Sequence, residues 1–374
     1  MQADFDVLHL RSSAGLYGAE YVVLGMIPEL NRVGIRSRLL CLDNQHLDSQ
    51  PLYERAIELN VPAERIPCRG RFDFATLKSL RDILRRERRS ILHVHDYKSA
   101  FHAWLAGGRS GSPIVATSHG HFASTTPLRF YNRLELALMK RFERVCVVST
   151  EMLPVLRRAG VDPAKTELIE NGIDTQRFNS HTSPLEKSTF GIPKDAIVFG
   201  SAMRLTEQKN PLGLVDAFAQ VATQLPRAVL VVAGDGPLRD SMIERARDRG
   251  MAGRMHFIGA RNDLDRFYRM LDVFVLPSHY EGLPLALLEA MACECAIVTT
   301  AVGQIPTVLD GSSAAIVAAG DTKALAQAMI DAVGQSRRDY LRARVVENYS
   351  VAHMTQRYAT VYQTLWNQRG RPAS

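Results

Sequence analysis

The chain has 374 residues, of which 46% are hydrophobic and 23% are charged. This is the composition of an ordinary globular protein of two or three domains, and it excludes a disordered, collagenous or coiled-coil chain. The net charge is +7, but no basic stripe is interleaved with aromatic residues, so nucleic acid is not an expected partner. Five cysteines without a Cys-x-x-Cys pair, and an N-terminus without the pattern of a secretory signal, favour a cytoplasmic location.

Short apolar runs alternate with amphipathic segments of helical length along the chain. The runs that predict strands are Phe5–Leu10, Ser37–Cys41, Ser90–Val94, Ile114–Thr117, Arg144–Val148, Ile197–Ala202, Ala228–Ala233, Met255–Ile258, Val273–Leu276, Ala296–Thr299 and Ala315–Val317. The segments that predict helices are Ala19–Arg32, Phe74–Arg89, Leu128–Lys140, Pro211–Leu225, Leu238–Arg249, Pro284–Ala292 and Asp339–Gln368. This alternation favours parallel sheets covered by helices on both faces. About eleven strands are many for one sheet and suit two.

A polar stretch without apolar periodicity, Asp174–Asp195, marks the expected boundary between the two sheets. The first domain is therefore expected over residues 1–180 and the second over residues 190–350. Doubly wound domains bind ligands at the carboxyl ends of their strands, so a cleft shared by the two domains is the expected site.

The first domain has two candidate contacts at strand ends. Gly15 and Gly18 lie between the first strand and the first helix, where glycines let the backbone approach a phosphate or sugar, although a plain tight turn explains them equally well. His119 follows a strand and could hydrogen-bond a sugar hydroxyl or orient a nucleophile, the alternative being a surface or supporting histidine. His93 and His95 have the spacing of a metal pair, but no third ligand is evident nearby, which favours a structural role.

Cations and glycines follow the first two strands of the second domain. Arg204 and Lys209 could converge on one diphosphate beside a helix N-terminus, the alternative being two ordinary surface cations. Gly234 and Gly236 supply a strand-to-helix turn, with Pro237 expected at the first helical position. This turn is expected to line the cleft without catalysing.

The strongest signal is a pair of carboxylates, Glu281 and Glu289, eight residues apart around the start of the predicted helix Pro284–Ala292. Eight helical residues span about 12 Å, which is the reach from a sugar ring across a diphosphate to a ribose. The backbone amides of Gly282 and Leu283 are expected to open the helix and bind phosphate oxygens. Glu289 lies in an apolar helix and needs hydrogen-bond donors, which ribose hydroxyls would supply.

These segments together resemble the retaining glycosyltransferases of family 4, the glycosyl transferases group 1, which have the GT-B fold. The resemblance covers nearly the whole chain and depends on seven motifs in order. They are Gly15, Gly18 and Glu20; Thr117–Gly120; Ile169–Asp174 with Phe178; Arg204 with Lys209 and Asn210; Gly234–Pro237; Phe257–Gly259; and Glu281 with Glu289.

The resemblance implies an α/β protein with two Rossmann-like, doubly wound parallel-sheet domains facing across a cleft. The N-terminal domain would bind the acceptor and the C-terminal domain a nucleotide-sugar, and a helix over residues 351–374 would pack back toward the N-terminal domain. The resemblance implies that Arg204, Lys209 and the amides of Gly282 and Leu283 contact the donor diphosphate, and that Glu289 contacts the ribose. Glu281 would contact the transferred sugar, and His119 would contact both substrates. Further donor-site glycines would be Gly15, Gly18 and Gly234.

The expected reaction is metal-independent transfer with retention, without a cofactor, because fixed cations aimed at the leaving diphosphate stabilise the transition state. Asp263 and Asp265 mimic a metal-binding Asp-x-Asp motif, but Asn262 and Asp263 are better interpreted as a helix cap. A UDP-sugar is the favoured donor and GDP-mannose the alternative. The acceptor is expected to be a glycan or lipid-linked molecule in bacterial-type synthesis of cell-surface polysaccharide or lipopolysaccharide.

Four positions depart from the family pattern. Glu294 and Ala296 stand where the family usually has glycine and proline, and Gln304 and Thr307 stand where it often has glycine and glutamate. They follow the helix of Glu289 and shape the donor pocket, so they leave the identity of the donor open more than the type of reaction.

Other functions and partners stay open at this point. A sugar phosphorylase or nucleotide-sugar epimerase on the same fold is one alternative, and a non-catalytic nucleotide-sugar-binding protein is another. A peripheral position on the inner face of the plasma membrane is a further hypothesis, because the basic segments 65–89 and 128–144 would attract anionic lipid. For the second segment, packing of Phe130, Leu134, Leu138 and Phe142 into the core is the simpler interpretation.

Overall fold

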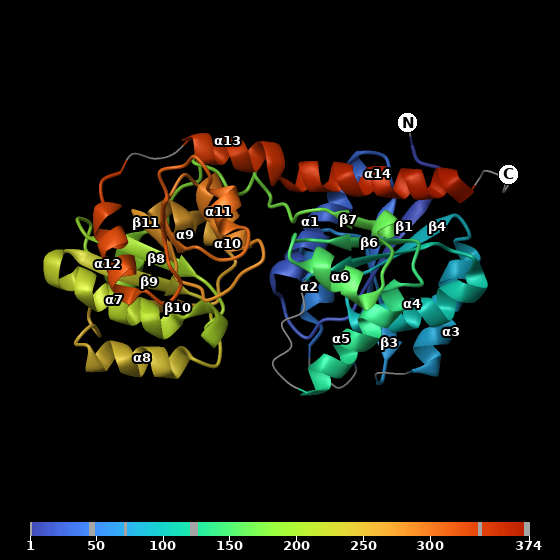
Figure 1. The fold of residues 1–374 in the computed structure, drawn as a ribbon, viewed down its shortest axis with the longest axis horizontal. Coiled ribbons are helices and arrows are strands. Elements are labelled where there is room, and N and C mark those ends of the chain that lie inside the picture. Colours follow the sequence, from blue (N-terminus) through green and yellow to red (C-terminus); the bar gives the residue numbers. More distant parts are fainter. Residues whose placement is uncertain (1, 45–48, 71–72, 120–125, 336–338, 370–374) are drawn as a thin grey trace. The chain divides into compact units, whose positions relative to one another are not determined.

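The computed structural model describes residues 2–44, 49–70, 73–119, 126–335 and 339–369. The chain forms two compact units, coloured along the sequence in Figure 1. The first unit comprises Met1–Gly172 together with Val351–Ser374, and the second comprises Ile173–Ser350. Each unit is built around one parallel sheet, which confirms the predicted fold class of two doubly wound domains.

The first unit contains a seven-stranded parallel sheet in the order β3-β2-β1-β4-β5-β6-β7. Its strands are β1 (Asp6–Arg11), β2 (Ser37–Asn44), β3 (Ala63–Cys68), β4 (Ser90–Val94), β5 (Ile114–Ser118), β6 (Arg144–Val147) and β7 (Thr166–Leu168). Its helices are α1 (Gly18–Arg32), α2 (Pro51–Glu58), α3 (Phe74–Arg86), α4 (Tyr97–Ser110), α5 (Thr126–Met139), α6 (Met152–Ala159) and α14 (Val351–Arg369). The strands β3 and β7 were not predicted.

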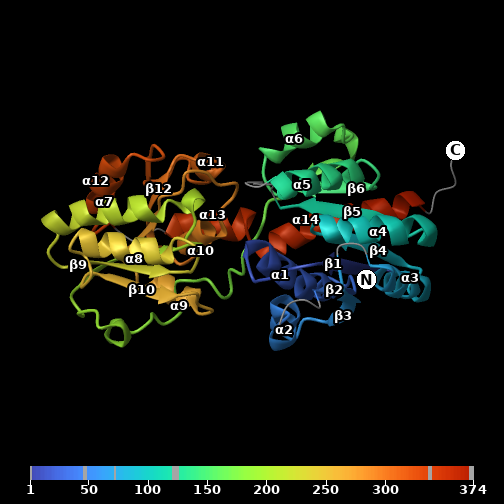
Figure 2. The same cartoon turned by 90° about the horizontal axis from the view of Figure 1, so that it is seen from below.

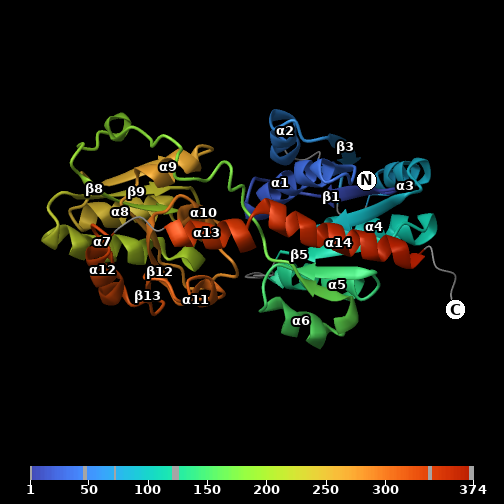
Figure 3. The same ribbon diagram turned by 90° about the horizontal axis from the view of Figure 1, so that it is seen from above.

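Alternate residues of these strands point to opposite faces of the sheet, and helices bury both faces. Leu40 and Leu42 pack with the apolar sides of α3 and α4, whereas Leu39 and Cys41 pack with those of α1 and α2. Helix α14 contacts α1, and Figure 3 shows it running along this unit. Tyr362 of α14 reaches the sheet, where its hydroxyl lies 2.6 Å from a ring nitrogen of β4.

The second unit contains a six-stranded parallel sheet in the order β10-β9-β8-β11-β12-β13. Its strands are β8 (Ile197–Ala202), β9 (Ala228–Ala233), β10 (Met255–Gly259), β11 (Val273–Leu276), β12 (Ala296–Thr300) and β13 (Ala315–Val317). Its α-helices are α7 (Pro211–Gln224), α8 (Arg239–Asp248), α9 (Leu264–Met270), α10 (Leu285–Ala292), α11 (Ile305–Val308), α12 (Thr322–Asp331) and α13 (Asp339–Asn348). Helices α7, α8 and α12 cover one face of the sheet and α9, α10 and α13 the other; Figure 2 looks onto the side of α7 and α8.

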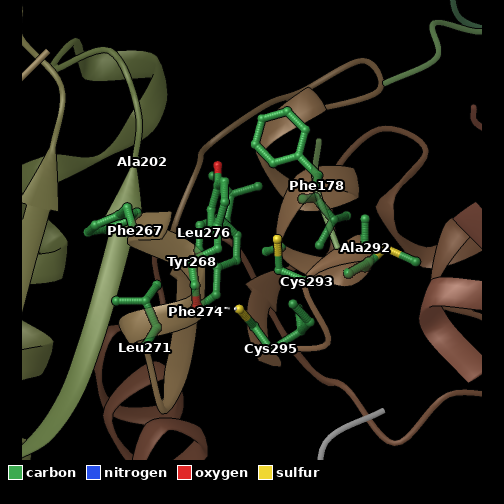
Figure 4. Close-up of a cluster of buried hydrophobic side chains, with 14 of the residues drawn as sticks. Phe178, Ala202, Phe267, Tyr268, Leu271, Phe274, Leu276, Ala292, Cys293 and Cys295 are labelled. Carbon is green, nitrogen blue, oxygen red and sulfur yellow. Dashed lines mark hydrogen bonds between the residues drawn. The ribbon is translucent and has the colours of Figure 1, made fainter. Parts of the chain in front are cut away.

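The boundary between the units differs from the predicted one. Phe178 and Leu185 belong to the stretch that was expected to link the domains, but both are buried in the core of the second unit. Figure 4 shows Phe178 in this core beside Tyr268 and the two cysteines Cys293 and Cys295. The second unit therefore begins at residue 173. Scattered apolar side chains within a polar sequence have no periodicity, which is why the stretch resembled a linker.

The tail forms two helices where one was predicted. Helix α13 ends at Asn348 within the second unit, and α14 begins at Val351 within the first. The residues between them pair with the start of the second unit, since the Ile173 amide donates to the Tyr349 carbonyl at 2.8 Å. None of the described helices is both long and apolar enough to cross a membrane.

Candidate active site

Four loops of the second unit meet at the carboxyl edge of its sheet. The chain runs from β8 outward to β9 and β10, and then returns to place β11 on the other side of β8. The connections after β8 and β11 therefore diverge, and a doubly wound sheet binds its ligand at such a switch point. The loops after β8, β9, β11 and β12 carry most of the predicted site residues.

Lys209 and Glu281 come together at this switch point. The Lys209 ammonium lies 2.6 and 2.7 Å from the two carboxylate oxygens of Glu281, although 72 residues separate them in sequence. The Ser278 hydroxyl donates to the same carboxylate at 2.6 Å. Glu281 is 5% exposed as a side chain and Lys209 is 20% exposed, so the ammonium is the more accessible member of the pair.

Hydrogen bonds fix the loops that carry this ion pair. The His279 amide donates to the Gln208 carbonyl at 2.8 Å, and the Gln208 side chain donates to the Tyr280 carbonyl at 3.1 Å. Arg204 lies on the same loop as Lys209 and is exposed. The two predicted phosphate-binding cations thus share one loop, and Glu281 lies against it.

Two glycines permit the close approach of these loops. A Cβ on Gly234, which has a φ of +138°, would lie 1.9 Å from the Met203 carbonyl oxygen. A Cβ on Gly303, with a φ of +55°, would lie 2.2 Å from the Glu281 carbonyl oxygen. Gly234 was predicted, whereas Gly303 was not. The expectation that Pro237 begins the next helix is wrong, because α8 starts two residues later.

The start of α10 differs from its prediction. The helix begins at Leu285, so Gly282 and Leu283 precede its cap at Pro284 and do not belong to its first turn. The predicted 12 Å of helix between the two carboxylates is therefore wrong. Neither of these two amides has an acceptor among the described residues, so both remain able to bind an anion. The Leu283 side chain is buried in the core, which leaves its backbone as the contact.

Glu289 points toward the core of the second unit and is partly buried. The Tyr268 hydroxyl donates to its carboxylate at 2.8 Å, a protein donor that the sequence did not reveal. Burial raises the pKa of Glu289 to about 7, against the lowering effects of the Tyr268 hydrogen bond and the charge of Arg177. The carboxylate is therefore poised to change its charge near neutral pH.

Two of the residues that depart from the family pattern have an informative backbone. Glu294 adopts a φ of +63°, a conformation in which the usual glycine would be unstrained. The backbone amide of Gln304 donates to the Gly282 carbonyl at 3.0 Å, so the backbone at this position helps to hold the loop after β11.

The two aspartates that mimic a metal motif are engaged elsewhere. Asp263 precedes α9 but makes no side-chain cap, and its carboxylate pairs with Arg261 at 2.6 Å. Asp265 pairs with Arg177 at 3.3 Å. Asp263 therefore occupies the N-cap position of α9, as predicted, but its side chain pairs with Arg261 and makes no capping hydrogen bond.

The carboxyl edge of the first sheet carries a buried polar network. Arg11 ends β1 and donates to Glu20 at 2.6 and 2.9 Å, and its guanidinium also reaches the His95 carbonyl. Glu20 further accepts from the Ser13 hydroxyl at 2.7 Å. Gly15 lies in this loop without a positive φ, and Gly18 is the first residue of α1. Both glycines belong to the first unit, whereas the other predicted donor-binding residues belong to the second.

His119 lies beside a cluster of buried histidines at this edge. Its Nε2 atom is 3.3 Å from Nδ1 of His95, and Nε2 of His95 is 3.0 Å from Nδ1 of His9. His9 lies opposite His93 in the register of β1 and β4. The inference that no third ligand lies near His93 and His95 is thus wrong, because one ring atom from each of the three histidines lies within 4.8 Å of the others. Gly120 and His121 lie outside the described residues.

Ser278, Gly303, Tyr268 and His9 were missed as contributors to these two edges. For Ser278, a position three residues before Glu281 was an available signal. The other three act across strands or loops, and their partners depend on register and backbone conformation. His9 showed only as a polar residue inside an apolar strand, which is itself unusual in a buried strand.

Two family models match most of the chain between them. The model for Glycosyltransferase Family 4 matches residues 16–177. The model for Glycosyl transferases group 1 matches residues 183–349. The two matched segments correspond to the two units, with the C-terminal helix α14 outside both.

Proteins named as glycosyltransferases are similar to this chain. The chain is 32% identical over 231 residues to UDP-Gal:alpha-D-GlcNAc-diphosphoundecaprenol alpha-1,3-galactosyltransferase of Escherichia coli, covering 59% of this chain and 60% of that protein. It is 28% identical over 298 residues to D-inositol 3-phosphate glycosyltransferase of Mycolicibacterium gilvum, covering 73% and 65%. The chain thus spans less than two thirds of the length of these relatives.

A solved structure has the same fold. The crystal structure of Anabaena HepE in complex with UDP and glucose superposes with a TM-score of 0.81 and 19% sequence identity. The match covers 96% of this chain and 100% of that chain. At this identity the likeness concerns the fold.

Proposed function

Because the chain belongs to the glycosyltransferases of group 1 and family 4, we propose that it transfers a sugar from a nucleotide-sugar to a glycan or lipid-linked acceptor. The observation that carries this proposal is the Lys209–Glu281 ion pair beside the open amides of Gly282 and Leu283. It places a cation, two phosphate-binding amides and a carboxylate at one switch point of a doubly wound sheet.

A UDP-sugar is the favoured donor and GDP-mannose the alternative. The E. coli relative is named for UDP-Gal and a diphosphoundecaprenol acceptor, and the HepE structure holds UDP and glucose. These names support a UDP-sugar donor and a lipid-linked acceptor in cell-surface polysaccharide or lipopolysaccharide synthesis. Glu289 would accept hydrogen bonds from the ribose hydroxyls while Tyr268 holds its other side.

Transfer begins with cleavage of the bond between the anomeric carbon and the diphosphate oxygen. Negative charge develops on the diphosphate, where Arg204, Lys209 and the two amides would stabilise it without a metal ion. Glu281 would accept from hydroxyls of the transferred sugar and keep the Lys209 ammonium in place. The acceptor hydroxyl attacks from the side that the diphosphate leaves, and its proton passes to the departing phosphate oxygen, so the configuration is retained.

The first unit would bind the acceptor, with His119 contacting the sugar substrates. A membrane surface is a further proposed partner. Leu138 of α5 and Phe142, which follows this helix, are buried, and Leu134 packs against the same core, as the simpler interpretation predicted. The side chain of Phe130 lies outside the described residues. What remains is a groove of about 430 Å³ between α5 and α6, lined by the cations Arg133, Lys140 and Arg158 and by the apolar Leu136, Ala137, Val155 and Ala159. This combination suits an anionic lipid.

The direct test is an activity screen of the purified chain with UDP-, GDP- and ADP-sugars and a lipid-diphosphate acceptor in EDTA. We expect UDP-sugar turnover that EDTA leaves intact and a product whose anomeric configuration, read by NMR, matches the donor. Activity that EDTA abolishes and Mn²⁺ restores would contradict metal independence, and an inverted product would contradict retention.

The same screen separates the alternative functions. Sugar phosphate released only when inorganic phosphate is present would identify a phosphorylase, and conversion of the donor without acceptor would identify an epimerase. Binding of UDP without turnover of any donor would identify a non-catalytic binding protein.

A further inference from the structure

Three side chains at the carboxyl edge of the second sheet form one hydrogen-bonded group around the carboxylate of Glu281. Oε1 of Glu281 accepts from the Ser278 hydroxyl and from the Lys209 ammonium, both at 2.6 Å, and Oε2 accepts from the same ammonium at 2.7 Å. Ser278 is completely buried, and the Glu281 side chain is 5% exposed. The Ser278 hydroxyl therefore holds the carboxylate from the interior side of the edge, while Lys209 holds it from the more accessible side.

The backbone that carries Ser278 and Glu281 is fixed by the neighbouring strand. The Thr300 hydroxyl, at the end of β12, donates to the Ser278 carbonyl at 2.6 Å. The backbone amide of Gln304 donates to the Gly282 carbonyl at 3.0 Å. Because the backbone is held on both sides of Glu281, the direction of its carboxylate depends on the side-chain torsions, which the Ser278 hydroxyl restrains.

A count of donors and acceptors shows what this group leaves for a ligand. A carboxylate has about four lone-pair sites, two on each oxygen, and an ammonium has three N–H groups. Ser278 and Lys209 fill both sites on Oε1, and Lys209 fills one of the two sites on Oε2. Among the described residues, the side chains of Glu281 and Lys209 make no other hydrogen bond. One lone pair on Oε2 and at least one N–H of the ammonium therefore remain.

We propose that Ser278 is a positioning residue, which fixes the Glu281 carboxylate so that its one remaining lone pair, on Oε2, accepts from a single hydroxyl of the transferred sugar. Without the Ser278 hydroxyl, Oε1 would have an open site as well, and either oxygen could turn toward the sugar. This inference rests on the proposed function for the identity of the ligand as a sugar. The restraint on the carboxylate is a property of the free protein.

A second buried hydroxyl in the same sheet provides the matched control. Thr299 is also completely buried, and its hydroxyl donates to the Leu276 carbonyl at 3.1 Å. Thr299→Val thus removes a buried hydroxyl and one hydrogen bond, as Ser278→Ala does, but leaves the contacts of Glu281 intact. A role of Ser278 in stability alone would make the two variants behave alike.

The first test uses the free protein, labelled with ¹⁵N-lysine and observed by NMR at low temperature. The ammonium signal of Lys209 is identified by its loss in Lys209→Ala. We expect its protons to exchange with water about threefold or more faster in Ser278→Ala, because a carboxylate that is free to turn holds the ammonium less well, and at an unchanged rate in Thr299→Val. An unchanged rate in a folded Ser278→Ala protein would overturn the proposal.

The second test measures transfer with the UDP-sugar that gives the highest turnover. Ser278→Ala should lower kcat about tenfold, because a misdirected carboxylate no longer meets the sugar hydroxyl in the transition state. Calorimetry should show UDP affinity within about twofold, since UDP carries no sugar to be positioned. Ser278→Thr, which keeps the hydroxyl, should restore most of the lost activity. Equal kcat losses in Ser278→Ala and Thr299→Val would overturn the positioning role.

A double-mutant comparison shows whether Ser278 acts through Glu281. In a Glu281→Ala background there is no carboxylate to position, so adding Ser278→Ala should change kcat by less than about twofold. A full tenfold loss in that background would contradict the proposal.

Two further outcomes keep the inference separate from protein folding and from the proposed function. If Ser278→Ala does not fold, Thr300→Val removes only the hydrogen bond to the Ser278 carbonyl. It should speed the exchange of the Lys209 ammonium in the same direction, and a rate equal to that of Thr299→Val would overturn the proposal. If the unaltered chain turns over no nucleotide-sugar, the proposed function is contradicted, and the exchange rates still decide whether Ser278 restrains Glu281.

Discussion

At the carboxyl edge of the first sheet, Arg11 and Glu20 form an ion pair that is buried on both sides. At the corresponding edge of the second sheet, Arg204 is exposed and Lys209 is partly exposed above a buried glutamate. The Lys98 ammonium of the first edge is likewise buried and donates to Asn44 at 2.5 Å. The two sheets have the same strand order apart from the additional edge strand β7 of the first. The charged side chains named at the first edge are bonded to other side chains and buried, whereas the second edge leaves cations within reach of solvent.

This difference indicates which kind of ligand each edge suits. An anion gains from cations that solvent can reach and from amides that lack an acceptor, as at Lys209 and at Gly282 and Leu283 respectively. A neutral polyol needs hydrogen-bond donors and acceptors that are held in place and carry no net charge. The Arg11–Glu20 ion pair and the neutral ring of His95 provide such groups at the first edge. Under the proposed function, the phosphate-bearing donor is therefore expected at the second edge and uncharged hydroxyl groups at the first.

Removing the ammonium at the second edge is expected to have the largest effect. Lys209→Ala should lower kcat about 10²- to 10³-fold, because the cation acts on charge that develops at the leaving group. Lys194→Ala, which removes an exposed lysine of the same unit, is the matched control and should leave kcat within about twofold. Steady-state rates of UDP release measure both, and an unchanged kcat for Lys209→Ala would remove this residue from the mechanism.

Crowding the second edge tests whether its loops must approach closely. Gly303→Ala and Gly250→Ala both place a side chain at a positive φ, but only the first Cβ meets backbone, because nothing lies within 4 Å of the second. Gly250→Ala should cost about 1–2 kcal/mol of unfolding free energy. Gly303→Ala should cost about 1–3 kcal/mol more and weaken UDP binding. Equal stability of the two variants in urea denaturation would show that the loop after β12 has room to move.

The sequence could predict only part of the second edge. Arg204, Lys209, Glu281 and Gly234 were found because each follows an apolar run and lies near glycine or proline. The contact of Lys209 with Glu281 was not predicted, because it depends on strand order, which brings β8 and β11 together across 72 residues. The start of α10 was placed early, since a proline cap and a proline in the first turn have the same sequence.

In the first unit, too, the sequence could not predict two of the strands or which residues lie side by side in the sheet. The segments of β3 and β7 were missed because both are edge strands with charged or polar residues, and neither has the apolar run of a central strand. His9 and His93 were each visible in the sequence, but only the parallel register of β1 and β4 sets them side by side. A single sequence has no information about register.

Neutralising the groove between α5 and α6 tests the proposed membrane contact. Each cation near an anionic surface contributes about 1 kcal/mol, so Lys140→Gln with Arg158→Gln should weaken binding to anionic vesicles several-fold per charge at low salt. Arg85→Gln with Arg86→Gln, in the basic segment 65–89, is the control and distinguishes the two candidate faces. Vesicle flotation measures both, and no binding of the unaltered chain would end the membrane proposal.

The titration of Glu289 should give the smallest effect. Its pKa of about 7 means that the carboxylate loses its proton as pH rises from 6 to 8, and an ionised oxygen accepts more strongly from ribose hydroxyls. UDP affinity should therefore rise about threefold over this range, and Glu289→Gln should abolish the rise. Calorimetric titration measures it, and the same pH dependence in both proteins would exclude Glu289 as its source.

The raised pKa of Glu289 also determines the direction in which the unfolding free energy of the ligand-free protein changes with pH. The folded state holds the Glu289 proton more tightly than the unfolded chain, so the contribution is present below pH 4.5 and is lost as pH rises toward about 7. Relative to Glu289→Gln, the unaltered chain should lose stability across that window in urea denaturation. If the unaltered chain instead gained stability relative to Glu289→Gln as the pH rose, the burial of this carboxyl group would be contradicted.

Hydrogen–deuterium exchange of the full chain with and without UDP locates the donor most directly. We predict slower exchange on adding UDP in residues 203–210, 234–238 and 278–284, with the amides of Gly282 and Leu283 among those protected, and little change around Arg11 and Glu20. Protection confined to the first unit, or absent from residues 278–284 under saturating UDP, would contradict the assignment of the donor to the second edge.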